Sequence, residues 1–99
     1  MNEKIKRAKI LLVDDEQECH EMFKDFTSER DLKIISAFSR KEATEKIMKT
    51  KQENEEPFDL IITDIVMEEE DAGIRLIKDI RKEGIITPLF VVSNIISQF

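Results

Sequence analysis

Apolar residues follow two different patterns along this chain. Four short runs are almost continuously apolar, which is typical of buried strands, and they predict strands at 10–13, 32–38, 58–67 and 86–94. Between these runs, apolar residues recur every three or four positions, which is typical of a helix with one buried face. The chain is therefore expected to alternate between strand and helix.

Residues 16–29 form the first predicted helix. Its apolar positions have the spacing i, i+3, i+4 and i+7 and are expected to face the core: Cys19, Met22, Phe23 and Phe26. His20 lies beside this stripe, so we expect it on the helix surface. A phospho-carrying histidine, or a metal ligand together with Cys19, are the functional alternatives at this position.

Two further helices are predicted. The sequence SRKE at 39–42 has the spacing of a capping box, which is typical of a helix start. A third helix is expected over 73–84, because Gly84 is well placed to end it. The inward-facing residues of these two helices are expected to be Ala43, Ile47, Met48, Ile74, Ile77 and Ile80.

This order of elements predicts an α/β fold. Strands that alternate with helices form a parallel sheet with helices on both faces. The length of 99 residues is sufficient for one domain with a modest core. Apolar residues make up 40% of the chain and charged residues 38%, which fits a soluble globular domain.

Acidic residues follow two of the predicted strands. Asp14 and Asp15 come directly after the first strand, and Asp64 lies near the end of the third. Ligands of open parallel sheets bind at the carboxyl ends of the strands, so these carboxylates would share a site if the two strands are neighbours. Their mutual repulsion then calls for a cation, and Mg²⁺ prefers such oxygen ligands. A solvated turn after the first strand is the plainer alternative.

Two further observations suggest phosphoryl chemistry at this edge. Ser93 lies at the end of the fourth predicted strand, where its hydroxyl could donate to a phosphoryl oxygen. Asp64 lies between strand and loop, and carboxylates in such positions can act as nucleophiles that form acyl phosphates.

Charge and cysteine content narrow the possible partners and location. The net charge of −6 and the lack of a basic stripe disfavour nucleic acid and anionic membranes as partners. Cys19 is the only cysteine, so no intrachain disulfide is possible. No apolar run approaches the ~20 residues of a membrane helix, and we expect a cytoplasmic protein.

Three motifs in the order ILLVDDE, FDLIITDIVM and TPLFVVSN resemble the receiver domain of two-component response regulators. The resemblance covers nearly the whole chain and implies a flavodoxin-like, doubly wound sheet of strand order 2-1-3-4-5. It also implies a phosphorelay role that needs Mg²⁺, with a phosphohistidine on a sensor histidine kinase as the donor. A receiver is a signalling module rather than an enzyme, with at most self-catalysed phosphotransfer and autodephosphorylation.

The resemblance assigns a role to each motif residue. Asp64 corresponds to the phospho-accepting aspartate, and Ser93 to the switch hydroxyl. The Mg²⁺ ligands would be Asp14, Asp15, Asp64 and the backbone carbonyl of Val66. Of the acidic pair, Asp15 is the residue expected to contact the ion directly.

The chain departs from the family pattern in two places. Glu68 stands where the family usually has proline, and one extra residue precedes Gly73. The sequence ends at Phe99, before the family's fifth strand, its lysine and the last helices. We therefore expect residues 1–99 to be a C-terminally incomplete receiver domain with four strands. The fourth strand would then be an apolar edge, which predicts self-association through LFVV or poor solubility.

Other functions remain as alternatives. The first is a non-phosphorylatable interaction module or fragment that lacks the lysine-bearing strand. A phosphatase of the haloacid-dehalogenase type would need a second acid two residues after Asp64, where Val66 stands. Nucleotide binding would need a glycine-rich loop where Asp14 and Asp15 stand.

Overall fold

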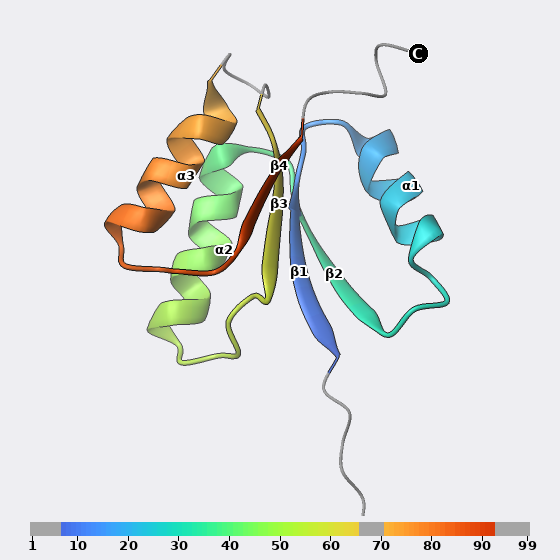
Figure 1. Cartoon of the computed structure of the whole chain (residues 1–99), viewed down its shortest axis with the longest axis horizontal. Coiled ribbons are helices and arrows are strands. Elements are labelled where there is room, and N and C mark those ends of the chain that lie inside the picture. The colour runs from blue at the N-terminus through green and yellow to red at the C-terminus, as the bar shows by residue number, and fades with distance from the viewer. Residues whose placement is uncertain (1–6, 66–70, 93–99) are drawn as a thin grey trace, which may run out of the picture.

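The computed structural model describes residues 7–65 and 71–92, which fold as a parallel sheet with helices on both faces (Figure 1). The elements in chain order are β1 (Ala8–Val13), α1 (Gln17–Phe26), β2 (Leu32–Ala37), α2 (Arg40–Gln52), β3 (Leu60–Asp64), α3 (Ala72–Lys82) and β4 (Leu89–Val92). The four strands are all parallel, in the order β2-β1-β3-β4. The predicted alternation and sheet are therefore confirmed.

The sheet separates two layers of unequal size. Helix α1 covers one face, and α2 and α3 lie together on the other (Figure 1). Successive side chains of a strand point to opposite faces, so Leu11 and Val13 of β1 point toward α2 and α3. They belong to one buried cluster with Ala37, Ala43, Ile47, Phe58, Ile61, Ala72, Leu76 and Ile80. This cluster is the main core of the described chain.

Strand ends differ slightly from the predicted ranges. The third strand is Leu60–Asp64 rather than 58–67, and the fourth is Leu89–Val92 rather than 86–94. Pro88 precedes β4, and its carbonyl accepts a hydrogen bond from the Ile61 amide. Proline has no amide hydrogen to give to a sheet, which explains why the strand begins after it.

Helix α2 begins as the capping box predicted. The Ser39 side chain accepts a hydrogen bond from the Glu42 amide, at 3.0 Å. The Glu42 carboxylate in turn accepts a hydrogen bond from the Phe38 amide, at 2.7 Å. Two backbone donors at the helix start are thereby satisfied. Ala43 and Ile47 are buried, as the apolar spacing predicted.

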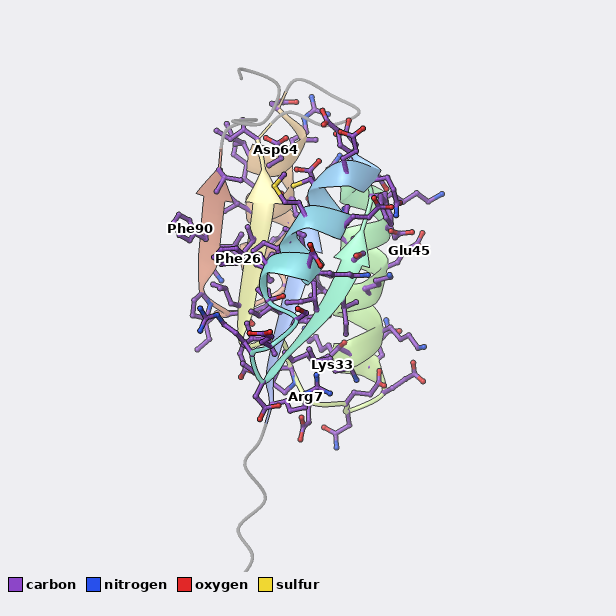
Figure 2. The ribbon with its side chains drawn as sticks, turned by 90° about the vertical axis from the view of Figure 1, so that its right-hand side faces the viewer. Arg7, Phe26, Lys33, Glu45, Asp64 and Phe90 are labelled. Carbon is purple, nitrogen blue, oxygen red and sulfur yellow. The ribbon has the colours of Figure 1, made fainter. Side chains whose placement is uncertain are left out.

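The predicted inward face of α1 is wrong for two of its four residues, since Cys19 and Phe23 are half-buried but the other two are exposed. Met22 and Phe26 are 50% and 76% exposed, and Phe26 is labelled in Figure 2, where α1 faces the viewer. His20, expected on the surface, is 1% exposed. The helix is rotated because the imidazole finds hydrogen-bond partners inside, which the spacing of apolar residues alone does not reveal.

The predicted line of isoleucines in α3 is also only partly buried. Ile80 is in the core, but Ile74 is exposed and Leu76 takes the inward position. Within 7–65 and 71–92, no helix combines the length and apolarity that crossing a bilayer requires.

Shortening a core side chain should test the assignment of the core to the α2 and α3 face. Leu11→Ala should lower the free energy of unfolding by about 3 kcal/mol, because it leaves a cavity in the central strand. Ile86→Ala, at a side chain that is 88% exposed, should change it by less than about 0.5 kcal/mol. Urea unfolding followed by circular dichroism measures both values, and equal losses would contradict this assignment.

Candidate metal centre at the carboxyl ends of the strands

Three carboxylates converge at the carboxyl ends of β1 and β3. Val13 pairs with Thr63 in the parallel register, so the residues that follow them meet at one edge of the sheet. One carboxylate oxygen from each of Asp14, Asp15 and Asp64 lies within 4.8 Å of the others. Asp64 is labelled at this edge in Figure 2. The structure thus brings together the acidic residues that the sequence placed at strand ends.

The three carboxylates differ in their exposure to solvent. Asp14 and Asp64 are 6% and 1% exposed, whereas Asp15 is exposed. Like charges at this distance repel strongly where water is excluded. A hard divalent cation with a preference for oxygen ligands offsets that repulsion, and a set of carboxylates open to solvent on one side suits Mg²⁺, which keeps several water ligands. The residues present therefore fit a magnesium site.

Asp14 is held through its amide, its carbonyl and its carboxylate. Its amide donates to the Ala37 carbonyl of β2 at 3.0 Å. Its carboxylate accepts a hydrogen bond from the Glu16 amide at 2.9 Å, and its carbonyl lies 2.7 Å from Nε2 of His20. The position of this residue is therefore fixed from three directions.

Asp64 is placed by the close approach of α3. The Gly73 amide donates to the Ile65 carbonyl at 2.9 Å, and the Ile65 amide donates to the Val92 carbonyl of β4 at 3.2 Å. A Cβ atom on Gly73 would overlap the Asp64 carbonyl oxygen and lie 2.8 Å from the Ile65 Cα. Only glycine allows this contact, because the neighbouring atoms belong to the backbone and have no other rotamer to adopt.

The role of Gly73 did not follow from the sequence patterns, which placed it only at a helix start. A signal was present, because glycine near the start of a helix costs helical stability and usually has a packing reason. Val66 and Ser93, the other two expected site residues, lie outside the described residues, as does Glu68.

Cys19 lies beside the acidic cluster. Burial, a hydrogen bond to Asp14 and the negative charges of Asp14, Asp64 and Glu16 together raise the pKa of its thiol to about 12, and burial is the largest of these causes. Each of these effects disfavours the thiolate. The thiol therefore stays protonated at neutral pH and is a poor metal ligand there.

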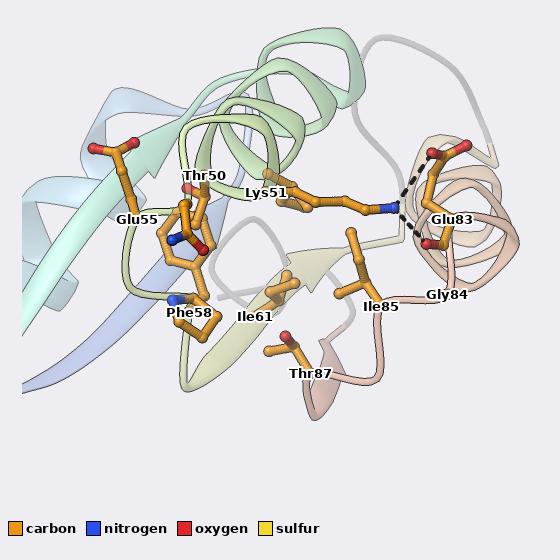
Figure 3. A pocket seen from close by; sticks show the side chains of 12 residues that line it. Thr50, Lys51, Glu55, Phe58, Ile61, Glu83, Gly84, Ile85 and Thr87 are labelled. Atoms are coloured by element: carbon orange, nitrogen blue, oxygen red, sulfur yellow. Dashed lines mark hydrogen bonds and ion pairs between the residues drawn. The ribbon is translucent and has the colours of Figure 1, made fainter.

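A cavity lies at the end of the sheet opposite the acidic cluster. This cavity of about 310 Å³ lies where α2 and α3 end and β3 and β4 begin (Figure 3). Phe58, Ile61 and Ile85 contribute apolar surface to it, and Lys51 donates a hydrogen bond across it to the Glu83 carbonyl at 2.9 Å. Because it lies at the amino ends of the strands, it is separate from the acidic cluster.

The raised pKa of Cys19 predicts slow alkylation. At a pH near the ordinary thiol pKa of about 8.5, iodoacetamide should modify Cys19 at least about tenfold more slowly in the folded protein than in urea, because the thiolate is scarce. The rate should keep rising with pH toward about 12, instead of levelling off near the ordinary thiol pKa. Asp14→Asn should increase the rate by removing a charge near the thiol, whereas Asp31→Asn, at an exposed ion pair with Arg7, should not. Equal rates in folded and unfolded protein would contradict the prediction.

Comparisons with known proteins agree with this fold. No curated protein matches the chain in sequence. The receiver domain of the Francisella response regulator 1452 is 30% identical with a TM-score of 0.69, and the match covers 87% of this chain and 65% of that one. The chain thus spans a little under two thirds of that relative's length.

Two other solved structures are similar. The chemotaxis response regulator CheY4 of Vibrio cholerae is 26% identical with a TM-score of 0.73, over 87% of this chain and 68% of that one. The receiver domain of the histidine kinase CKI1 from Arabidopsis thaliana, complexed with Mg²⁺ and BeF₃⁻, is 26% identical with a TM-score of 0.66, over 87% of this chain and 65% of that one.

The match to a protein family extends over most of the sequence. Residues 10–98 match the family described as the response regulator receiver domain, a span that includes every described strand and helix except the first two residues of β1. The sheet order, the acidic cluster and this match agree. The chain therefore belongs to the response regulator receiver domain family.

Proposed function

We propose that this chain is a phosphoacceptor module that receives a phosphoryl group on Asp64 from a sensor histidine kinase, with Mg²⁺ bound at the acidic cluster. The observation that carries the proposal is the convergence of three carboxylates from β1 and β3 within 4.8 Å. Receiver domains bind Mg²⁺ at an acidic pocket, and the related receiver of CKI1 was solved with Mg²⁺ and BeF₃⁻.

Asp14, Asp15 and Asp64 would hold the ion. Asp15 is exposed and is therefore the most accessible of the three to a hydrated cation. Asp14 already accepts the Glu16 amide through one carboxylate oxygen, which fits a supporting role. When bound, Mg²⁺ would supply positive charge that offsets the negative charge of these carboxylates and of an incoming phosphoryl group. The roles given to the Val66 carbonyl and the Ser93 hydroxyl stay predictions.

The chemical step would be an in-line displacement by Asp64. An oxygen of its carboxylate forms a bond to phosphorus while the phosphorus–nitrogen bond of the donor phosphohistidine breaks, and the imidazole leaves with the electron pair and takes up a proton. The product is an acyl phosphate on Asp64. Transfer of this kind needs mainly positioning and charge stabilisation, and the buried, backbone-anchored Asp64 provides the positioning.

The partner and location are also proposals. A sensor histidine kinase as donor follows from membership of the receiver family. The exposed Phe90 of β4, visible at the surface in Figure 2, is consistent with self-association through this strand. Both self-association and a cytoplasmic location stay predictions.

Phosphorylation by a small donor tests the proposal directly. Incubation with acetyl phosphate and MgCl₂ should add one phosphoryl group, seen by intact-protein mass spectrometry. Asp64→Asn should abolish the gain because it removes the nucleophile, and so should EDTA. Asp31→Asn, a matched change at an exposed aspartate outside the acidic cluster, should leave the mass gain unchanged.

Two results would contradict the proposal. One is a folded protein that binds Mg²⁺ but gains no mass, which would favour a non-phosphorylatable interaction module. The other is a mass gain that persists in Asp64→Asn, which would place the modification elsewhere.

The contact of Gly73 with Asp64 gives a second prediction. Gly73→Ala should force α3 away from the end of β3, so we expect Mg²⁺ to bind about tenfold more weakly, as when other groups that hold a metal ligand are lost. Gly84→Ala is the matched control: its φ of +77° makes alanine strained, but no atom lies within 4 Å of the added methyl group. This control should lower stability by about 1 kcal/mol without changing Mg²⁺ affinity. Calorimetric titration measures the affinities, and equal affinities in both variants would contradict the prediction.

A further inference from the structure

We propose that His20 is a positioning residue for the acidic pair, which it orients by binding the peptide group between Asp14 and Asp15. The proposal rests on the proposed Mg²⁺ site, since it concerns how that site is held. His20 itself is too deep to meet a ligand, because it is 1% exposed. Its effect would pass through the backbone of β1 and the turn that follows.

The hydrogen bonds of His20 define its orientation. Nε2 lies 2.7 Å from the Asp14 carbonyl oxygen, which can only accept, so Nε2 donates. Nδ1 lies 2.9 Å from the Ser36 hydroxyl. The ring also packs against Phe38, with 4.1 Å between the ring centroids. The imidazole is therefore held by the Asp14 carbonyl, by Ser36 of β2 and by Phe38, which follows the end of β2.

The accepted carbonyl is the important feature. The Asp14 carbonyl belongs to the peptide unit that joins Asp14 to Asp15, and this unit is nearly planar. A hydrogen bond to it restricts the orientation of the plane, which together with the φ angle of Asp15 sets the direction in which the Asp15 side chain leaves the backbone. Asp15 is exposed, so packing contributes little to its orientation.

Other hydrogen bonds hold the parts of Asp14 that His20 does not contact. The Asp14 amide is held by Ala37, and the Asp14 carboxylate by the Glu16 amide. These two bonds hold Asp14 through its amide and through its side chain. The bond from His20 fixes the next peptide plane, so that the exposed and the buried carboxylate keep one relative arrangement. Groups that hold metal ligands in this way commonly change metal affinity when they are removed.

Mg²⁺ alone is the probe for the test, with the full chain as the protein. His20→Leu removes both hydrogen bonds and should weaken Mg²⁺ binding by about tenfold or more in calorimetric titration. His20→Gln can still donate from a position near Nε2 and should recover most of the affinity. Ile47→Val, a core change on the opposite face of the sheet, is the control for lost stability and should bind Mg²⁺ within about twofold of wild type.

A gentler variant covers the case in which His20→Leu does not fold. Ser36→Ala keeps the ring but removes the bond to Nδ1, and it should weaken Mg²⁺ binding about threefold, as expected for one neutral hydrogen bond. His20→Gln is expected to bind Mg²⁺ nearly as well as wild type, so Ser36→Ala decides the test if His20→Leu does not fold. The backbone is measured as well.

The backbone readout is independent of Mg²⁺. The Asp15 amide belongs to the same peptide unit as the Asp14 carbonyl, so its ¹⁵N–¹H resonance should shift in Ser36→Ala and His20→Leu, but not in Ile47→Val, before any Mg²⁺ is added. An unshifted Asp15 resonance, or wild-type Mg²⁺ affinity in His20→Leu or Ser36→Ala, would overturn the proposal for His20. Failure of the wild-type chain to bind Mg²⁺ would instead overturn the proposed function, and the Asp15 resonance would still decide whether His20 orients this peptide.

Discussion

Repulsion between carboxylates at the shared end of β1 and β3 is the constraint that the surrounding structure has to meet. Parallel pairing of these central strands brings Asp14, Asp15 and Asp64 to one edge, two of them nearly out of contact with water. Such an arrangement is unfavourable for folding unless the backbone holds the groups firmly and a cation offsets the charge. Both conditions suit a site for a divalent ion.

Contacts from four different elements hold the backbone of the acidic residues in place, which is the first of these conditions. β2 binds the Asp14 amide, α1 supplies His20 to the Asp14 carbonyl, and β4 binds the Ile65 amide next to Asp64. The start of α3 completes the set through Gly73, which lets the helix touch the backbone of β3. The acidic edge is thus linked to every layer of the fold, whereas the cavity between the ends of α2 and α3 is lined largely by residues at the opposite end.

The local sequence was sufficient for the elements, the parallel sheet and the acidic residues at its edge. Continuous apolar runs identify buried strands because both of their faces are covered, and the capping box at Ser39 satisfies donors within a few residues of itself. Asp14, Asp15 and Asp64 could be chosen because parallel strands present their carboxyl ends on one side. The resemblance to receiver domains supplied the strand order that makes β1 and β3 neighbours.

The partners of His20 and Gly73 were decided only by the tertiary structure. Apolar spacing predicted Met22 and Phe26 inside and His20 outside, yet α1 is rotated so that the imidazole reaches Ser36 and Asp14. Similarly, nothing near Gly73 in sequence indicates that the Asp64 carbonyl will lie against it. Periodicity records which residues avoid water, but a buried polar ring or a missing side chain is explained by groups that come from other elements, and only folding brings those groups together.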